Sequence, residues 1–220
     1  MISGRILAAL ASGVLLTSGV AAFAAGSTPH GPAMTADAMM GGSAEKGRYG
    51  GPVYNGAPAL PVTVALVMAG GGPGKFSTAT ALTSMVGSDL VNAEVGKLTK
   101  QYGKDRVTLW LKTFDFAVND AVKVATDAGV KLPAPANLSG KKLAVTLVQA
   151  GTYTDGTFYI EYLLDKAVSH KIHSQVMDNI DKQPGLGPKA DLDYHRISNQ
   201  AFYDLAQALG ATSVKLADLH

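Results

Sequence analysis

Hydrophobic residues recur at spacings of three and four from residue 76 onward, which is the period of an amphipathic helix. Four long periodic segments cover residues 77–102, 105–128, 155–183 and 190–209, and a shorter one covers 141–150. The long segments end close to glycines, which terminate helices because they adopt a positive φ without a steric penalty. These are Gly103, Gly129, Gly185 and Gly210.

The second long segment shows the apolar stripe most clearly. Val107, Trp110, Phe114 and Val118 all fall on one face of a helix. Long amphipathic helices joined by short loops are typical of an antiparallel four-helix bundle. We therefore predict an all-α domain over residues 76–210, with one extra short helix, followed by a tail over 211–220.

An apolar, β-branched run precedes this domain and ends in a glycine-rich stretch. For residues 60–75 we predict an extended segment followed by a glycine-rich hinge. The sequence from Ala69 to Ser77 resembles a phosphate-binding loop, but Ala69 replaces its first glycine and Phe76 replaces its magnesium-binding hydroxyl residue. A hinge is favoured over nucleotide binding, and docking of a partner chain on Gly70–Phe76 is a further possibility.

The N-terminal region has the composition of an exported protein. Residues 1–24 contain Arg5, an apolar run and the small-residue cleavage site Ala22-Phe23-Ala24, as expected of a signal peptide. Residues 25–59 are rich in Gly, Pro, Ala and Met without periodicity, which predicts a flexible tether. We expect a bacterial periplasmic or secreted protein with no membrane span once the signal peptide is removed.

Charge and composition narrow the classes of partner. The formal net charge is +2, and it falls to +1 after loss of Arg5 with the signal peptide, so a nucleic-acid partner is not expected. The chain has no cysteine, which excludes disulfides and thiolate metal sites. An envelope protein or a small ligand is the expected partner.

Three residues are candidates for a metal site. Glu94 lies between Leu90 and Leu98 on the predicted buried face of its helix, and His170 and His173 share one side of another helix. A buried carboxylate and imidazole could share a metal ion or a proton. The competing interpretation is structural, with Glu94 paired to a neighbouring lysine and His170 in the core.

A second candidate for metal binding lies in the tether. Its thioether groups and one imidazole suit copper(I), although their spacing is irregular. These residues are His30, Met34, Met39 and Met40.

The chain resembles an exported bacterial family of unknown function that adopts a ferritin-like four-helix bundle. The resemblance covers about residues 78–182. It rests on Glu94-Val95 in the first helix, on the sequence from Ala128 to Pro133 at the end of the second, and on the aromatic and histidine pattern of the third, which ends at His170. It implies a ferritin-like fold and a metal site that includes Glu94 and His170.

The chain departs from this family pattern at the other ligand positions. The family's Asp-His marker aligns with Thr113-Phe114, and the nearest match to its last histidine is Tyr194-His195. The chain also lacks the Glu-x-x-His pairs of di-iron bundles. We therefore expect a non-catalytic, exported helical bundle with a binding or envelope-stress role. The alternative is a ferritin-like metal-binding protein that uses Glu94, His170 and His173 to hold Fe, Mn, Zn or Cu.

Overall fold

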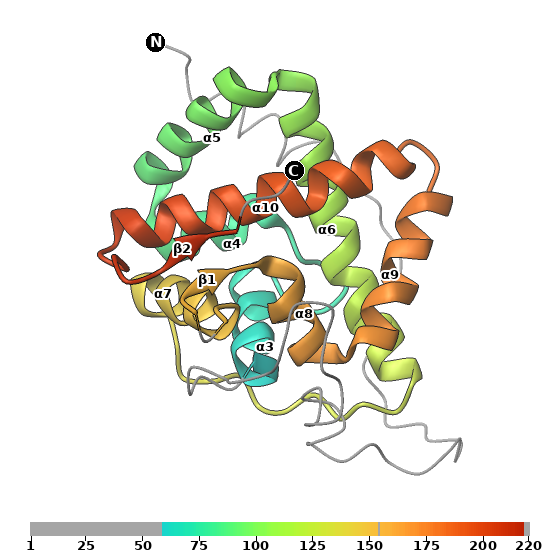
Figure 1. The fold of residues 1–220 in the computed structure, drawn as a ribbon. Helices are drawn as coiled ribbons and strands as arrows, with labels where there is room; N and C mark the ends of the chain where they lie inside the picture. Colours follow the sequence, from blue (N-terminus) through green and yellow to red (C-terminus); the bar gives the residue numbers. More distant parts are fainter. Residues whose placement is uncertain (1–58, 154, 218–220) are drawn as a thin grey trace.

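The computed structural model describes residues 59–153 and 155–217, and this part of the chain is mainly helical (Figure 1). This confirms the predicted all-α class. The helices are α3 (Ala59–Ala69), α4 (Thr78–Val86), α5 (Ser88–Tyr102), α6 (Lys104–Asp127), α7 (Gly140–Ala150), α8 (Ile160–Val168), α9 (His170–Lys182) and α10 (Pro188–Ala208). Two short strands, β1 (Thr157–Phe158) and β2 (Lys215–Leu216), complete the elements of these residues.

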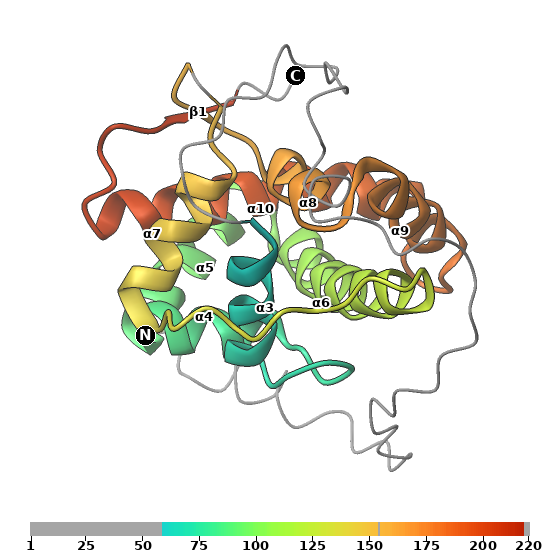
Figure 2. The same cartoon turned by 90° about the horizontal axis from the view of Figure 1, so that it is seen from below.

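Helices α6 and α10 form the centre of the molecule. They pack against each other, and both also contact α5 and α9. Figure 1 shows α10 crossing α6, with α5 and α9 toward opposite sides. Helix α3 packs against α4, α7 and α8, and Figure 2 shows it from below, between α7 and α6. The site described below lies where α8, α9 and α10 meet.

The prediction of an extended segment over residues 60–75 is wrong, because Ala59–Ala69 is helix α3. Its β-branched residues favour a strand, but a strand here would need hydrogen-bond partners for its backbone. A helix satisfies those groups internally while the side chains are buried. The apolar side chains of α3 are distributed around the whole helix rather than on one face, as expected for a buried helix. The buried ones are Ala59, Leu60, Val62, Ala65, Leu66 and Val67.

The expected glycine-rich hinge is a hydrogen-bonded turn packed on α6. Phe76 is buried beside Phe114, with ring centroids 6.1 Å apart. The Asn119 side chain accepts a hydrogen bond from the Phe76 N–H at 3.1 Å and donates one to its carbonyl at 3.1 Å. Gly70 lies against the Phe76 ring, so close that a Cβ at this position would overlap it. The turn therefore has a structural reason for its glycine at position 70.

Two of the four predicted long helices are each divided into two. The segment 77–102 consists of α4 and α5, which meet at Gly87 with φ 83°. The segment 155–183 contains β1, α8 and α9, and the two helices meet at Ser169 with φ 76°. Helices α6, α7 and α10 agree with the predicted segments to within about two residues at each end.

The predicted tail also contributes structure. Residues 215 and 216 form β2, which pairs in parallel with β1, with Thr157 opposite Lys215. Asn199 of α10 fixes the same region, because its side chain accepts a hydrogen bond from the Ile160 N–H at 2.9 Å and donates one to the Phe158 carbonyl at 3.3 Å. Both β1 and the first turn of α8 are therefore attached to α10.

Polar contacts inside the core join the two central helices. The buried Trp110 Nε1–H donates to Ser198 Oγ at 2.8 Å. The Arg106 guanidinium forms a two-point ion pair with the buried Asp193 carboxylate, with Nε 2.7 Å from Oδ2. These contacts link α6 to α10 at two positions along the helices.

Among the described residues, no helix has both the length and the apolar character needed to cross a membrane. The predicted signal peptide (1–24) and the tether as far as residue 58 lie outside the described residues.

Candidate metal centre

The candidate site is built at the junction between α8 and α9. Ser169 separates the two helices with φ 76° and ψ 150°, a conformation that residues other than glycine rarely adopt. The Ser169 N–H donates to the Asp165 carbonyl at 2.9 Å, and the His173 N–H donates to the Ser169 carbonyl at 3.0 Å. The sharp change of direction turns the start of α9 back toward the last turns of α8.

Four side chains converge at this junction. Glu161 and Asp165 are four residues apart on α8, and His170 and His173 are three residues apart on α9, so each pair shares a helix face. Each side chain offers one ligand atom, and these four atoms all lie within 4.8 Å of one another. Two ligands of one tetrahedral zinc ion lie roughly 3 to 3.5 Å apart, given bonds of about 2.0–2.2 Å. Small side-chain movements would therefore bring the four ligand atoms to the separations that a bound metal ion requires.

Asp165 connects both histidines. Its Oδ2 lies 3.1 Å from His170 Nδ1, and its Oδ1 lies 2.8 Å from His173 Nδ1. A carboxylate accepts hydrogen bonds, so each Nδ1 carries a proton that points at Asp165 when no ion is present. A bound cation would take the place of these protons.

The cluster runs from the surface into the interior. The side-chain exposure is 51% for His170, 29% for Asp165 and 3% for His173. An ion can thus enter from solvent at His170 and reach a partly desolvated position beside His173, where charge interactions are less screened.

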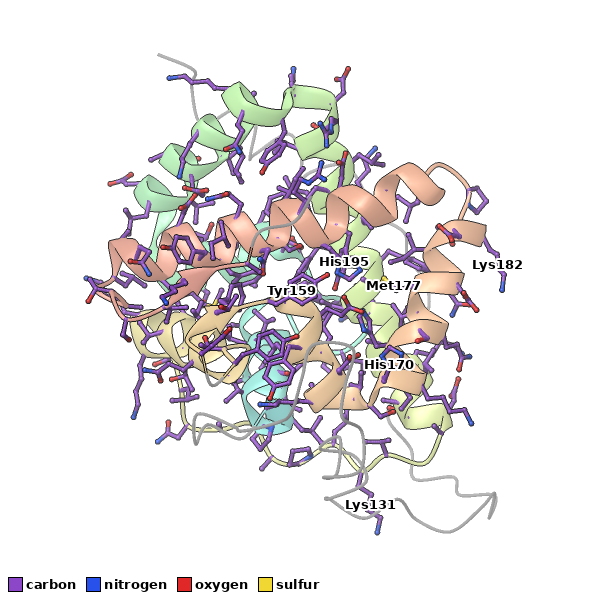
Figure 3. The ribbon with its side chains drawn as sticks, viewed as in Figure 1. Lys131, Tyr159, His170, Met177, Lys182 and His195 are labelled. Carbon is purple, nitrogen blue, oxygen red and sulfur yellow. The ribbon has the colours of Figure 1, made fainter. Side chains whose placement is uncertain are left out.

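The buried side of His173 faces an aromatic region. Its Nε2 is buried and has no hydrogen-bond partner among the residues that the structure describes. The His195 ring of α10 lies edge-on to the His173 ring, with centroids 5.7 Å apart, and also packs against Tyr159 and Tyr194. Figure 3 shows His195 and Tyr159 in the region where α10 passes α8.

A lysine lies on the adjacent face of α8. Lys166 is 6% exposed, and its Nζ lies 3.8 Å from the centroid of the Tyr162 ring, which stacks on Tyr153. Burial lowers the pKa of Lys166 to about 8. Its ammonium is held against an aromatic face rather than against the carboxylates of the cluster.

The structure brings two of the three predicted metal ligands together and places the third elsewhere. His170 and His173 belong to the cluster, whereas Glu94 of α5 lies beside Asp204 of α10 and Lys97. The structural interpretation is wrong in two respects: Lys97 forms its ion pair with Asp204 rather than with Glu94, and His170 lies at the surface rather than in the core.

Glu94 is part of a carboxyl pair. One of its oxygens, Oε1, is buried and finds no hydrogen-bond partner within residues 59–153 and 155–217. Burial, and then the nearby Asp204 carboxylate, raise the pKa of Glu94 to about 7, and the charge of Lys97 acts in the opposite direction. The group is suited to sharing a proton with Asp204.

The positions aligned with the family's Asp-His marker have a packing role. Thr113 is buried and donates from Oγ1 to the Leu109 carbonyl at 2.8 Å. Phe114 is buried among aromatic rings, including those of Tyr194 and Phe202. Tyr194 is part of this core, whereas His195 faces His173.

Sequence reasoning missed Glu161 and Asp165. In one straight helix over 155–183, Asp165 and His173 would be separated by eight residues, or about 12 Å along the axis. The break at Ser169 removes this separation. The available signal was a carboxylate pair spaced for one helix face, followed within a few residues by a similarly spaced histidine pair.

Comparisons of the chain with protein-family models, with curated proteins and with solved structures find no match.

Proposed function

We propose that this protein binds a divalent transition-metal ion through Glu161, Asp165, His170 and His173. The observation that carries the proposal is the convergence of four ligand atoms from two helices within 4.8 Å. The buried position of His173 and the contacts of Asp165 with both imidazoles support it further.

The ligand chemistry narrows the class of ion. Two imidazoles and two carboxylates suit zinc, iron, manganese or copper(II), whereas calcium and magnesium prefer oxygen ligands alone. Two carboxylates also balance the charge of a divalent ion, which reduces the cost of placing it beside the buried His173. The metal-binding alternative derived from the sequence is thereby kept, with Glu161 and Asp165 in place of Glu94.

We propose a binding or envelope-stress role rather than catalysis, in an exported protein. The signal-peptide pattern of residues 1–24 supports export. The mass of the mature protein recovered from the periplasm tests export, since cleavage after residue 24 predicts a new N-terminus at Ala25.

We also propose a relationship to the exported ferritin-like family, supported by the Glu94-Val95 and His170 positions. An experimental structure would test whether the protein has the four-helix arrangement of that family.

Calorimetric titration of the metal-free mature protein with Zn²⁺ tests the metal site directly. We expect one ion per chain at the cluster, and a loss of affinity in Asp165→Asn greater than the 10- to 100-fold loss that is typical of outer-shell changes. Asp178→Asn removes an exposed carboxylate from the same part of the molecule and is the matched control. Equal zinc affinity in the wild type and Asp165→Asn would reject this site.

A further inference from the structure

The carboxylate cluster uses only one nitrogen of His173. Asp165 contacts Nδ1, and the opposite nitrogen, Nε2, points away from the carboxylates into the protein. The His173 side chain is only 3% exposed, so water does not readily reach this nitrogen to form a hydrogen bond. A buried polar atom without a partner is uncommon in folded proteins and calls for a functional explanation.

Two other potential ligands come from the elements around Nε2. His195 presents its ring edge-on to His173, at an interplanar angle of 71°. Met177 is one helical turn after His173 on α9, is partly buried and packs on the core. Figure 3 shows the Met177 side chain extending from α9 in the direction of His195.

We propose that His173 Nε2, His195 and Met177 form a second metal site, selective for copper(I). Imidazole and thioether are ligands that suit this soft ion. None of the three offers a negatively charged ligand atom, and Tyr159 and Tyr194 pack against His195 with their aromatic rings. Such surroundings favour an ion of single charge, because the desolvation cost is greater for a divalent ion.

The two metal sites therefore use opposite nitrogens of one imidazole. Asp165 serves as a ligand in the divalent site and as the acceptor of the Nδ1 proton in the copper(I) site, where it orients the ring and makes Nε2 a better donor. Copper(I) binding does not require the divalent ion. Both ions together would require an imidazole without protons, so we expect them to compete.

An anaerobic titration against a chromophoric copper(I) chelator tests the proposal. The tether methionines are rival ligands, so the background is the mature protein with Met34, Met39 and Met40 changed to leucine. In this background we expect one copper(I) ion per chain, and a loss of affinity of at least about tenfold in Met177→Leu, a change that conserves side-chain volume. His195→Phe keeps an aromatic ring and should show a similar or greater loss.

Met68→Leu is the matched control, because Met68 is the exposed methionine of α3, with 52% exposure. Its copper(I) affinity should equal that of the background. X-ray absorption should show sulfur in the copper shell of the background protein and no sulfur in Met177→Leu. Thermal unfolding verifies that each variant is folded.

Unchanged copper(I) affinity in folded Met177→Leu and His195→Phe would overturn the proposal, as would the absence of bound copper once the tether methionines are removed. Zinc titration of the same two variants separates this result from failure of the divalent site. Zinc affinity should stay unchanged in both, whereas Asp165→Asn should lose it.

Discussion

Asp165 Oδ1 lies 2.8 Å from His173 Nδ1, across the break between α8 and α9. The two residues are eight positions apart in sequence, and their contact joins the exposed and the buried parts of the candidate metal site. A metal ion bound at this contact should stabilise the folded state, because the unfolded chain does not hold the four ligands together.

We therefore expect zinc to raise the melting temperature of the wild-type protein. At a free concentration of about 100 times Kd the stabilisation is about 2.7 kcal/mol, which corresponds to roughly 5–10 °C for a chain of this size. Differential scanning calorimetry with and without zinc measures the shift. Asp165→Asn should show little or no shift, and an equal shift in this variant would contradict the assignment.

The backbone at Ser169 provides a second prediction. With φ 76° and ψ 150° it lies in a region that is almost exclusive to glycine. We expect Ser169→Gly to be more stable than Ser169→Ala by about 1–2 kcal/mol, the reverse of the order inside a helix. Chemical denaturation of both variants measures the difference. The opposite order would show that this residue does not hold a positive φ in solution.

The carboxyl pair of α5 and α10 should make stability depend on pH. The Glu94 pKa rises from its ordinary value of 4.5 to about 7. The stabilising effect of protonation is thus present below about pH 4.5, and is lost as the pH rises through 7. Glu94→Gln mimics the protonated form. It should have little effect near pH 4.5 and should stabilise the protein by about 1–2 kcal/mol at pH 8, allowing for solvent screening.

Urea unfolding at the two pH values measures this difference. Asp89→Asn, on the exposed surface of the same helix, is the control for loss of one negative charge. If Glu94→Gln and Asp89→Asn showed the same pH dependence, the raised pKa of Glu94 would be wrong.

The hydrogen bond between Trp110 and Ser198 joins the two central helices at a fully buried position. Ser198→Ala leaves the indole N–H without this partner, and we expect a loss of about 1–3 kcal/mol. The chain has one tryptophan, so its fluorescence reports unfolding directly. A double-mutant cycle with Trp110→Phe removes this fluorescent residue, so circular dichroism follows unfolding of all four proteins in the cycle. The second change should cost less than the same change in the wild type, and additive losses would argue against the bond.

Gly70 tests the structural role of the glycine-rich turn. A Cβ here would overlap the Phe76 ring and lie 3.1 Å from the Ser77 carbonyl oxygen. Gly70→Ala should displace the buried ring from Phe114 and destabilise the protein by about 1–3 kcal/mol. Gly96→Ala is the control, because Gly96 is inside α5 with open space around it. That change should instead stabilise the protein by about 0.5–1 kcal/mol, since alanine is the better helix former. Equal changes in the free energy of unfolding for the two variants would show that Gly70 is not packed tightly against the Phe76 ring.

The helical class and several helix ends could be predicted because their signals are local. The stripe on α6 and the glycine after its end need only the period of a helix and the conformational freedom of one residue. The shared face of His170 and His173 follows from a three-residue spacing in the same way.

The amino-acid sequence by itself therefore determined the periodic segments, the positions of their glycine ends and the residue types available for metal chemistry. The tertiary structure decided what these segments pack against. It made Ala59–Ala69 a helix despite its β-branched residues, because burial among α4, α7 and α8 requires internally paired backbone groups. It also placed a break at Ser169, where no glycine or proline marks one. That break brings Asp165 to His173 and leaves Glu94 with Asp204, because which side chains meet depends on the direction of whole helices rather than on their local spacing.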